Sequence, residues 1–386
     1  MSAPLCAVAD EILLALLKHM PAPWRLAVCK SLRAFLRAQD GTHNNPKLTA
    51  YVKVNAQRYL ASSRYCGKED RLLAVLHQHC GRYAVQGLAL AGLRAEFGNA
   101  NLGPVLSLTP SLTELDLSTT FLRLNSFNYY LGRLTALHTL RLSGNRDFLR
   151  DAGPIFPTAL TSLQLGYCSV TEFGLRMLIW SLARPGLALT DLGLENNALQ
   201  RTTLLPDLLE GLTALQRLDL SMTDVSSDYL VAVTRALPTS LRVLRLAGLP
   251  VNDPRRIVFP KKLSKARIVH RIASDRRIFD SLCRLPRLEC LNLNGMHVGA
   301  NADALATALS LMPQMQELSL CGIEVDAAGA ASIAGALSAM HSLKSVQMYD
   351  VFIGPSGARA FVAAVAGHAT PVELPLTGSN FCMEDL

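Results

Sequence analysis

The residues whose types best suit chemistry form a group of cysteines and histidines early in the chain. Cys66, His77, His79 and Cys80 are side chains that zinc prefers. Their spacing matches no zinc-site template, and two histidines two residues apart on a helix would point in different directions. The pattern therefore favours a partly buried helix face, and we expect no metal site here.

Nucleophiles and acid–base pairs give a similarly weak signal. Cys290 and Cys321 fall at outward positions of two expected strands, too far apart to pair, with no His or carboxylate evidently placed to activate either thiol. Motifs for phosphate loops, dinucleotides, zinc proteases and serine hydrolases are absent. We expect no catalytic residues, no cofactor and no enzymatic activity, because the outward carboxylates are scattered singly: Glu114, Asp116, Asp191 and Asp219.

Basic charge is concentrated in two parts of the chain. The stretch "RRIVFPKKLSKARIVHRIASDRR", residues 255–277, holds nine Lys and Arg against one Asp, in a chain of net charge +8. Residues 1–84 hold twelve basic and five acidic residues, so the rest of the chain, outside both of these parts, is net acidic. Such a basic region could attract an acidic protein, a phosphorylated peptide or a nucleic-acid backbone, or it could be an ordinary solvated surface.

An internal repeat of the form L-x-x-L-x-L organises the chain from about residue 85 to residue 377. In the L-x-L core, the leucines point inward from a short strand and their neighbours point outward. One such strand cannot bury its apolar side alone, so successive units must stack as a parallel sheet with return segments behind it. Copies begin at Leu112, Leu137, Leu160, Leu189, Leu215, Leu241, Leu288, Met315 and Leu343.

The motif resembles the leucine-rich repeat family. The resemblance implies an α/β leucine-rich-repeat solenoid: a horseshoe with a concave parallel sheet and a convex side of helices or irregular turns. The Ala-rich returns in the repeats of 27 and 28 residues are similar to the ribonuclease-inhibitor-like subclass. We expect about twelve repeats and a short C-terminal cap within residues 85–386. The Asn position of the family is held only in part, by Asn145, Cys168, Asn197 and Thr223.

One interval is nearly twice the usual length. Leu241 and Leu288 are 47 residues apart, and "FPKKL" at 259–263 is similar to the entries of other strands. We favour a degenerate repeat starting at Leu263 over an inserted loop, which would be unusual inside a compact solenoid. This interpretation predicts a basic cluster on the concave face, partly offset by one Asp, made of Arg217, Asp219, Arg245, Lys265, Arg267 and Asn292.

The N-terminal segment differs from the repeats. Residues 1–40 predict two amphipathic helices, and residues 41–84 predict a helical linker or cap. The first segment resembles an F-box, which implies docking to the Skp-type adaptor of a cullin-RING ubiquitin ligase. A helical cap over the first repeat is the alternative. The adaptor contact would involve Ile12, Leu13, Leu16, Leu17, Met20, Pro21, Val28, Cys29 and Leu32.

Together these features predict a protein-interaction scaffold rather than an enzyme. Nine cysteines without paired spacing and the absence of a long apolar run suit a reducing, cytoplasmic or nuclear location away from membranes. The leading hypothesis is an F-box and leucine-rich-repeat substrate receptor of a ubiquitin ligase, with an acidic or phosphorylated protein substrate. The alternative is an assembly subunit of a large complex, including a ribonucleoprotein. No small-molecule substrate is expected.

Overall fold

The structure is a computed structural model that describes residues 50–53, 85–92, 98–120, 122, 124–150, 153–182, 184–199, 202–223, 225–248, 272–273 and 275–376. The chain forms two compact units. The first comprises residues 1–169 and 180–189, and the second comprises residues 170–179 and 190–386.

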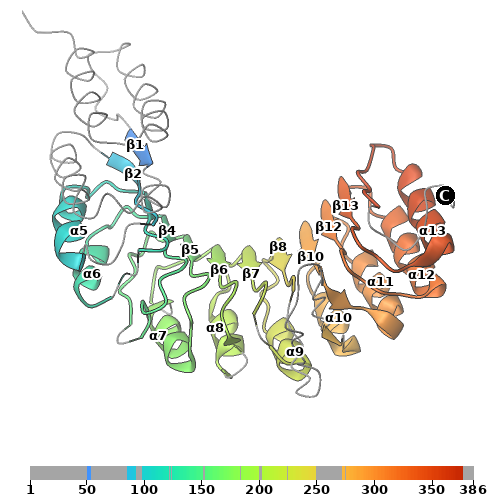
Figure 1. Cartoon of the computed structure of the whole chain (residues 1–386), viewed down its shortest axis with the longest axis horizontal. Helices are drawn as coiled ribbons and strands as arrows, with labels where there is room; N and C mark the ends of the chain where they lie inside the picture. The colour runs from blue at the N-terminus through green and yellow to red at the C-terminus, as the bar shows by residue number, and fades with distance from the viewer. Residues whose placement is uncertain are drawn as a thin grey trace, which may run out of the picture. The chain divides into compact units, whose positions relative to one another are not determined.

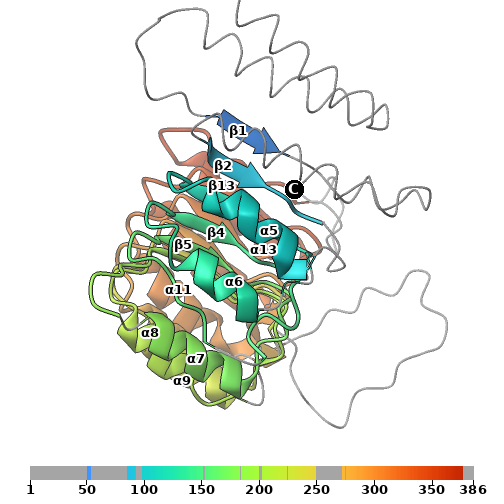
Figure 2. The same cartoon turned by 90° about the vertical axis from the view of Figure 1, so that its left-hand side faces the viewer.

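The first unit contains a parallel sheet in which each strand pairs with the next one along the chain. Its central leucines lie side by side from strand to strand, and Leu115, Leu140 and Leu163 are completely buried. Helices α5 (Gly98–Ser107) and α6 (Leu124–Leu131) lie next to each other along one side (Figure 2). The strands are β1 (Ala50–Lys53), β2 (Val85–Ala89), β3 (Glu114–Asp116), β4 (Thr139–Arg141) and β5 (Ser162–Gln164).

The second unit repeats this arrangement. Its parallel strands are β6 (Asp191–Gly193), β7 (Arg217–Asp219), β8 (Val243–Arg245), β10 (Cys290–Asn292), β12 (Glu317–Ser319) and β13 (Ser345–Gln347). The central residues of these strands are at most 1% exposed and lie in register: Leu192, Leu218, Leu244, Leu291, Leu318 and Val346.

Helices fill most of the return segments between strands. Helix α7 (Glu172–Leu182) follows β5, and in the second unit the helices stand on the side of the sheet visible below the strands in Figure 1. These are α8 (Leu205–Gly211), α9 (Ser227–Arg235), α10 (Arg276–Leu282), α11 (Ala302–Ser310), α12 (Ala327–Ser338) and α13 (Gly354–Ala366). Their buried side chains pack on the inward leucines. Each unit is therefore an α/β stack of repeats, with parallel strands on one side and return segments on the other, as the sequence predicts.

Helix starts follow local sequence signals. At α12 the Asp326 carboxylate accepts a hydrogen bond of 2.8 Å from the Gly329 backbone N–H, and at α9 Ser226 accepts from the Tyr229 N–H. Such side-chain caps satisfy backbone donors that have no partner within the helix. The shortest repeat, which begins at Leu137, has only turns in its described return.

The predicted helical linker over 41–84 is wrong at the four of its residues that the structure describes. Ala50–Lys53 form β1, which pairs in parallel with β2. Without β1, strand β2 of the first expected repeat, at Val85, would leave a row of unpaired backbone N–H and C=O groups at the edge of the sheet. The "AYVK" sequence, with Tyr51 and Val52, has the residue types that suit a strand in that place. The F-box-like segment, residues 1–40, lies outside the described residues.

The prediction of a degenerate repeat between Leu241 and Leu288 is also wrong. Strand β8 pairs directly with β10: Leu244 lies beside Leu291, and the Leu246 N–H donates to the Asn292 carbonyl at 2.9 Å. No strand lies between β8 and β10 in the described sheet, so no repeat strand separates them there. Residues 249–271, with Leu263, lie outside the described residues, and we call 249–274 the inserted segment. Pairing with the Leu-x-Leu core of β10 buries more apolar surface than Ala266 and Ile268 would have offered.

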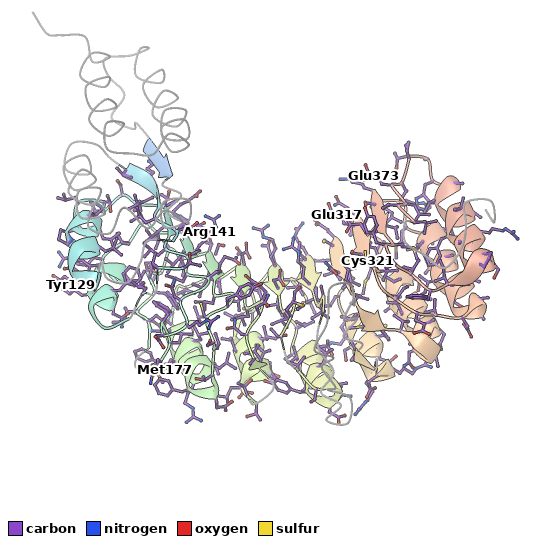
Figure 3. The ribbon with its side chains drawn as sticks, viewed as in Figure 1. Tyr129, Arg141, Met177, Glu317, Cys321 and Glu373 are labelled. Atoms are coloured by element: carbon purple, nitrogen blue, oxygen red, sulfur yellow. The ribbon has the colours of Figure 1, made fainter. Side chains whose placement is uncertain are left out.

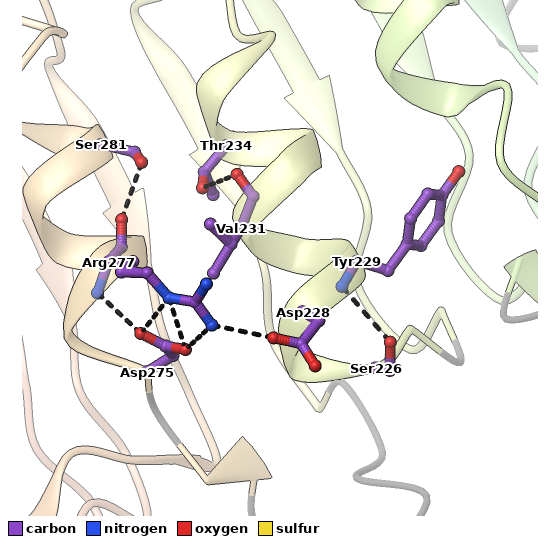
Figure 4. A network of polar contacts seen from close by, with 8 residues as sticks. All are labelled: Ser226, Asp228, Tyr229, Val231, Thr234, Asp275, Arg277 and Ser281. Carbon is purple, nitrogen blue, oxygen red and sulfur yellow. Dashed lines mark hydrogen bonds and ion pairs between the residues drawn. The ribbon is translucent and has the colours of Figure 1, made fainter.

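The described residues just before α10 are bound to the neighbouring repeat. Strand β9 (Ile272–Ala273) pairs with β11 (Met296–His297) in a separate two-stranded sheet. Asp275 then caps α10 by accepting from the Arg277 N–H, and the Arg277 guanidinium bridges Asp275 and Asp228 of α9, the latter at 2.8 Å (Figure 4). Hydrogen bonds from Arg277 hold the pKa of Asp275 below its ordinary range. The side chains of Arg277 and Asp228 are largely exposed, so their ion pair adds little stability. Its main effect is to fix the position of the chain at the start of α10.

Buried polar side chains connect neighbouring repeats at the position predicted for Asn. The Asn145 amide donates to the carbonyls of Leu117 and Leu142 at 2.8 and 2.7 Å. Its Oδ1 accepts from the backbone N–H groups of Thr120 and Leu122 at 3.1 and 2.8 Å. Asn145 thus satisfies four backbone groups of two repeats, and the partial ladder predicted from the sequence is confirmed at this position.

Asn197 and Thr223 hold the equivalent positions in the second unit. Asn197 accepts from the Val170 N–H at 3.0 Å and donates to the Leu194 carbonyl at 2.8 Å. Thr223, with its single hydroxyl, donates to the Leu220 carbonyl of its own repeat at 2.6 Å. Asn197 therefore continues the link between repeats, whereas the bond of Thr223 stays within one repeat.

We expect Asn145→Leu to lower the free energy of unfolding by about 2–3 kcal/mol, since buried backbone groups lose their partners. Urea unfolding followed by circular dichroism measures this. Ser338→Ala, which removes only a local bond to the Gly335 carbonyl on an exposed helix end, should change stability by less than about 0.5 kcal/mol. Equal effects of the two substitutions would contradict the bridging role of Asn145.

Candidate interaction surface

The side of the sheet away from the helices presents two outward residues from each strand. We call this surface of the second unit the open face. The central residue of each strand is buried, and its two neighbours point to the other side because side chains alternate along a strand. The outward residues are Asp191, Gly193, Arg217, Asp219, Val243, Arg245, Cys290, Asn292, Glu317, Ser319, Ser345 and Gln347.

Four of the six residues predicted for the basic cluster lie together on this face. Register places Asp219 beside Arg245, and Arg245 beside Asn292, on the adjacent strands β7, β8 and β10; Arg217 is on β7 as well. Lys265 and Arg267 lie outside the described residues. The insertion removes them from the strand next to Arg245, and Asn292 takes the place predicted for Arg267.

The arginines of the open face are each paired with a carboxylate. The Arg217 Nε lies 3.2 Å from Asp191 Oδ2, and the Arg245 Nη1 lies 3.6 Å from Asp219 Oδ2. Each pair joins the same repeat position of neighbouring strands. The described part of the face is therefore charge-balanced, and the basic cluster, which also needs Lys265 and Arg267, stays a prediction.

A third ion pair joins equivalent positions of neighbouring repeats just before their strands. Arg242 precedes β8 and forms an ion pair with Glu289, which precedes β10. The sequence held the signal for these pairs: opposite charges occupy equivalent positions of consecutive repeats. Asp191 and Glu289 were missed as partners because we considered each carboxylate singly. In the first unit Arg141 Nη1 lies 3.9 Å from Glu114 Oε2, but these residues are not at equivalent positions, since Glu114 lies beside Thr139.

Glu195, just beyond β6, is the least satisfied carboxylate of the open face. Its Oε2 atom is buried and has no hydrogen-bond partner within the described part of the chain. Burial raises the pKa of Glu195 from its ordinary value, and the nearby charges of Asp219 and Asp191 raise it further while Arg245 opposes them. Sequence patterning did not single this residue out, because burial at a turn leaves no periodic signal.

We expect Glu195→Gln to raise the free energy of unfolding at neutral pH and to have little effect near about pH 4. The folded pKa lies above the unfolded value of 4.5, so stability falls as pH rises through that interval. Below it, Glu195 is neutral in both states and resembles Gln. Urea unfolding across this pH range measures the difference.

Glu210→Gln, on the exposed face of α8, is the matched control and should change stability by less than about 0.5 kcal/mol. If Glu195→Gln raised the free energy of unfolding by the same amount at both pH values, burial of the charge would not be the cause.

The last strands carry a polar network rather than a reactive one. The Ser319 hydroxyl lies 2.7 Å from Asn294 Oδ1 and 3.2 Å from Gln347 Oε1. Near it on these strands are Glu317 and Cys321, which Figure 3 labels together with Glu373. The Asn294 Oδ1 also accepts from the Cys321 N–H at 2.8 Å, so the amide links two neighbouring strand ends.

The thiols of this region do not look like nucleophiles. Burial raises the pKa of Cys290, and the carboxylate of Glu317, 3.7 Å from its Sγ, raises it further. The thiol of Cys290 therefore stays protonated at neutral pH, and only the thiolate is a strong nucleophile. Cys290 and Cys321 are both free, as expected.

The described residues contain neither a metal-binding cluster nor a helix that could span a membrane. They hold no group of three His, Cys, Asp or Glu side chains that could bind a metal ion. Cys66, His77, His79 and Cys80 lie outside them. Among the helices that the structure describes, none is both long and apolar enough to cross a membrane.

Comparisons with known proteins give limited similarity. No family model matches the chain. Podocan-like protein 1 of Mus musculus is 32% identical over 139 residues, which is 36% of this chain. The match spans less than a quarter of that protein, 23% of its length. An internalin (inlF) from Listeria monocytogenes superposes with a TM-score of 0.47 at 13% identity, over 81% of this chain and 76% of that one.

Proposed function

We propose that this leucine-rich-repeat solenoid is a non-catalytic scaffold whose open face binds a protein partner. The observation that carries the proposal is the ladder of opposite charges on adjacent strands, in which the exposed Arg217 and Arg245 pair with the largely buried Asp191 and Asp219. Rigid strands fix the position of these groups without the entropy cost of ordering a loop.

Such ion pairs suit protein recognition. The side chains of Arg217 and Arg245 are 57% and 53% exposed, and surface pairs of this kind contribute only about 0–1 kcal/mol to stability. A partner with complementary charges can therefore replace these ion pairs with its own at little cost in free energy. The new ion pairs would then fix the orientation of the partner. The nine cysteines of the sequence, an odd number without paired spacing, support a cytoplasmic or nuclear location.

The finer proposal is a substrate receptor of a cullin-RING ubiquitin ligase, with repeats similar to the ribonuclease-inhibitor-like subclass. Its support is the F-box-like sequence of residues 1–40, which lies outside the described part of the chain. In this proposal the N-terminal segment binds a Skp-type adaptor, and the open face binds an acidic or phosphorylated substrate protein. The mixed charge of the open face favours a partner that itself carries both signs of charge.

Co-purification tests the adaptor contact. We expect the full chain to retain a Skp-type adaptor, and Leu16→Asp combined with Val28→Asp to abolish retention, because charged groups cannot replace apolar contacts in such an interface. Arg217→Ala on the open face is the matched control and should leave adaptor binding intact. If the unsubstituted chain retains no adaptor while circular dichroism shows the solenoid folded, the receptor proposal fails.

A second candidate is an assembly subunit of a ribonucleoprotein complex. The observation in its favour is the charge of the insertion, since residues 249–271 contain seven Lys and Arg and one Asp. A contact between these groups and RNA phosphates would weaken steeply as salt rises.

Charge reversal in the insertion distinguishes the two candidates. We expect Lys265→Glu combined with Arg267→Glu to remove RNA association measured by filter binding to a mixed RNA pool, and Arg176→Glu on the exposed face of α7 to retain it. RNA binding that is absent from the unsubstituted chain, or insensitive to both salt and this reversal, excludes the ribonucleoprotein role.

A further inference from the structure

We propose that the first unit carries a second docking surface, on its helix side, for a partner protein segment that combines apolar side chains with carboxylates. We call it the aromatic surface and define it by Tyr129, Ile155 and Trp180, with Arg133 and Arg184 at its margin. It goes beyond the proposed function, since the return segments that form it face away from the outward strand residues of their own unit.

The aromatic surface exposes side chains that a solenoid ordinarily buries. Tyr129 and Trp180 are each 63% exposed and Ile155 is 41% exposed. The core does not need them, because Leu175, Leu178 and Leu182 already bury the inner face of α7. Exposed apolar groups gathered in this way are typical of interaction sites.

Polar contacts hold the three return segments next to one another. The Asn128 side chain of α6 donates to the Gly153 carbonyl at 2.8 Å and accepts from the Ile155 N–H at 2.7 Å. A Cβ at Gly132 would lie 3.5 Å from the Ile155 side chain, so Ile155 rests against α6. Arg184, one turn beyond Trp180, donates to the Phe156 carbonyl at 3.4 Å. Tyr129, Ile155 and Trp180 therefore come from consecutive, mutually fastened segments.

Tyr129 is held in place before any partner arrives. The Arg133 guanidinium lies over its ring, 5.2 Å from the centroid, and donates to its hydroxyl at 2.7 Å. The ring also meets the edge of Tyr130, whose own ring fills the space that a Cβ at Gly103 would need. Figure 3 shows Tyr129 at the outer side of α6, away from the sheet. A side chain already fixed loses little entropy on binding.

Charge defines the partner's chemistry. Among the described residues, neither Arg133 nor Arg184 pairs with a carboxylate, whereas Asp147 of this unit is already paired with Arg150 at 3.5 Å. Two cations beside exposed Trp and Tyr side chains make a combination that dominates protein interfaces. A segment with Leu-type side chains flanked by Asp or Glu complements them. Nucleic-acid bases fit less well, because Arg133 covers a face of Tyr129 on which a base would stack.

Fluorescence titration of the full chain tests this surface. The chain has two tryptophans, so Trp24→Phe leaves Trp180 as the only reporter. The probe is a synthetic helical peptide with Leu on one face and Glu on its flanks, compared with the same peptide in which Lys replaces every Glu. We expect the Glu peptide to shift Trp180 emission to shorter wavelength, and Tyr129→Ala and Arg184→Gln each to weaken its binding by about tenfold.

Two comparisons make the result decisive. Leu311→Ala removes an equally exposed apolar side chain of the second unit, 49% exposed, and should leave binding of the Glu peptide unchanged. The proposal is overturned if the Glu peptide does not bind, or if the Lys peptide binds as tightly. It is also overturned if oligouridylate or anionic lipid vesicles shift Trp180 emission in preference to the Glu peptide. Circular dichroism confirms that each exposed-site variant is folded.

Discussion

Burial of the two inward leucines of each repeat is the interaction on which the rest of the structure depends. A strand of three residues, such as Leu218 with its two neighbours, has too little surface to bury these side chains alone. Each repeat therefore owes its stability to the repeats on either side. The buried amide of Asn145 adds to this dependence, because it satisfies backbone groups of two repeats at once.

The same constraint explains why a long insertion is tolerated. Strands β8 and β10 pair directly although the interval between them is nearly twice the usual repeat length, so their leucines still meet. The link between Asp228, Arg277 and Asp275 fixes the return point on the helix side. Closing a longer loop costs little free energy compared with losing a strand from the stack. The repeat therefore keeps its register while its return segment varies.

Fixed inward residues also place the outward ones. Adjacent strands are about 4.8 Å apart, so opposite charges at equivalent repeat positions meet without further organisation. This accounts for the ion pairs of the open face, and for the cost at Glu195, which has no such partner. On the helix side of the first unit, by contrast, Tyr129 and Trp180 are exposed although nothing in the core requires it. The two surfaces thus offer different chemistry to partners, charge on one and aromatic contact on the other.

The sequence by itself determined the fold, the strands of the L-x-x-L-x-L repeats and the partial Asn ladder, because these repeats and buried Asn145 reflect contacts that recur at fixed intervals. It also contained the signal for the ion pairs of the open face, in opposite charges at equivalent repeat positions. Only the tertiary structure decided that β8 pairs directly with β10, that Ala50–Lys53 form a strand, and that the Glu195 Oε2 atom is buried. These features depend on which segments pair across long stretches of chain, and such pairing is set by competition for the sheet edge and for apolar burial, which local periodicity does not encode.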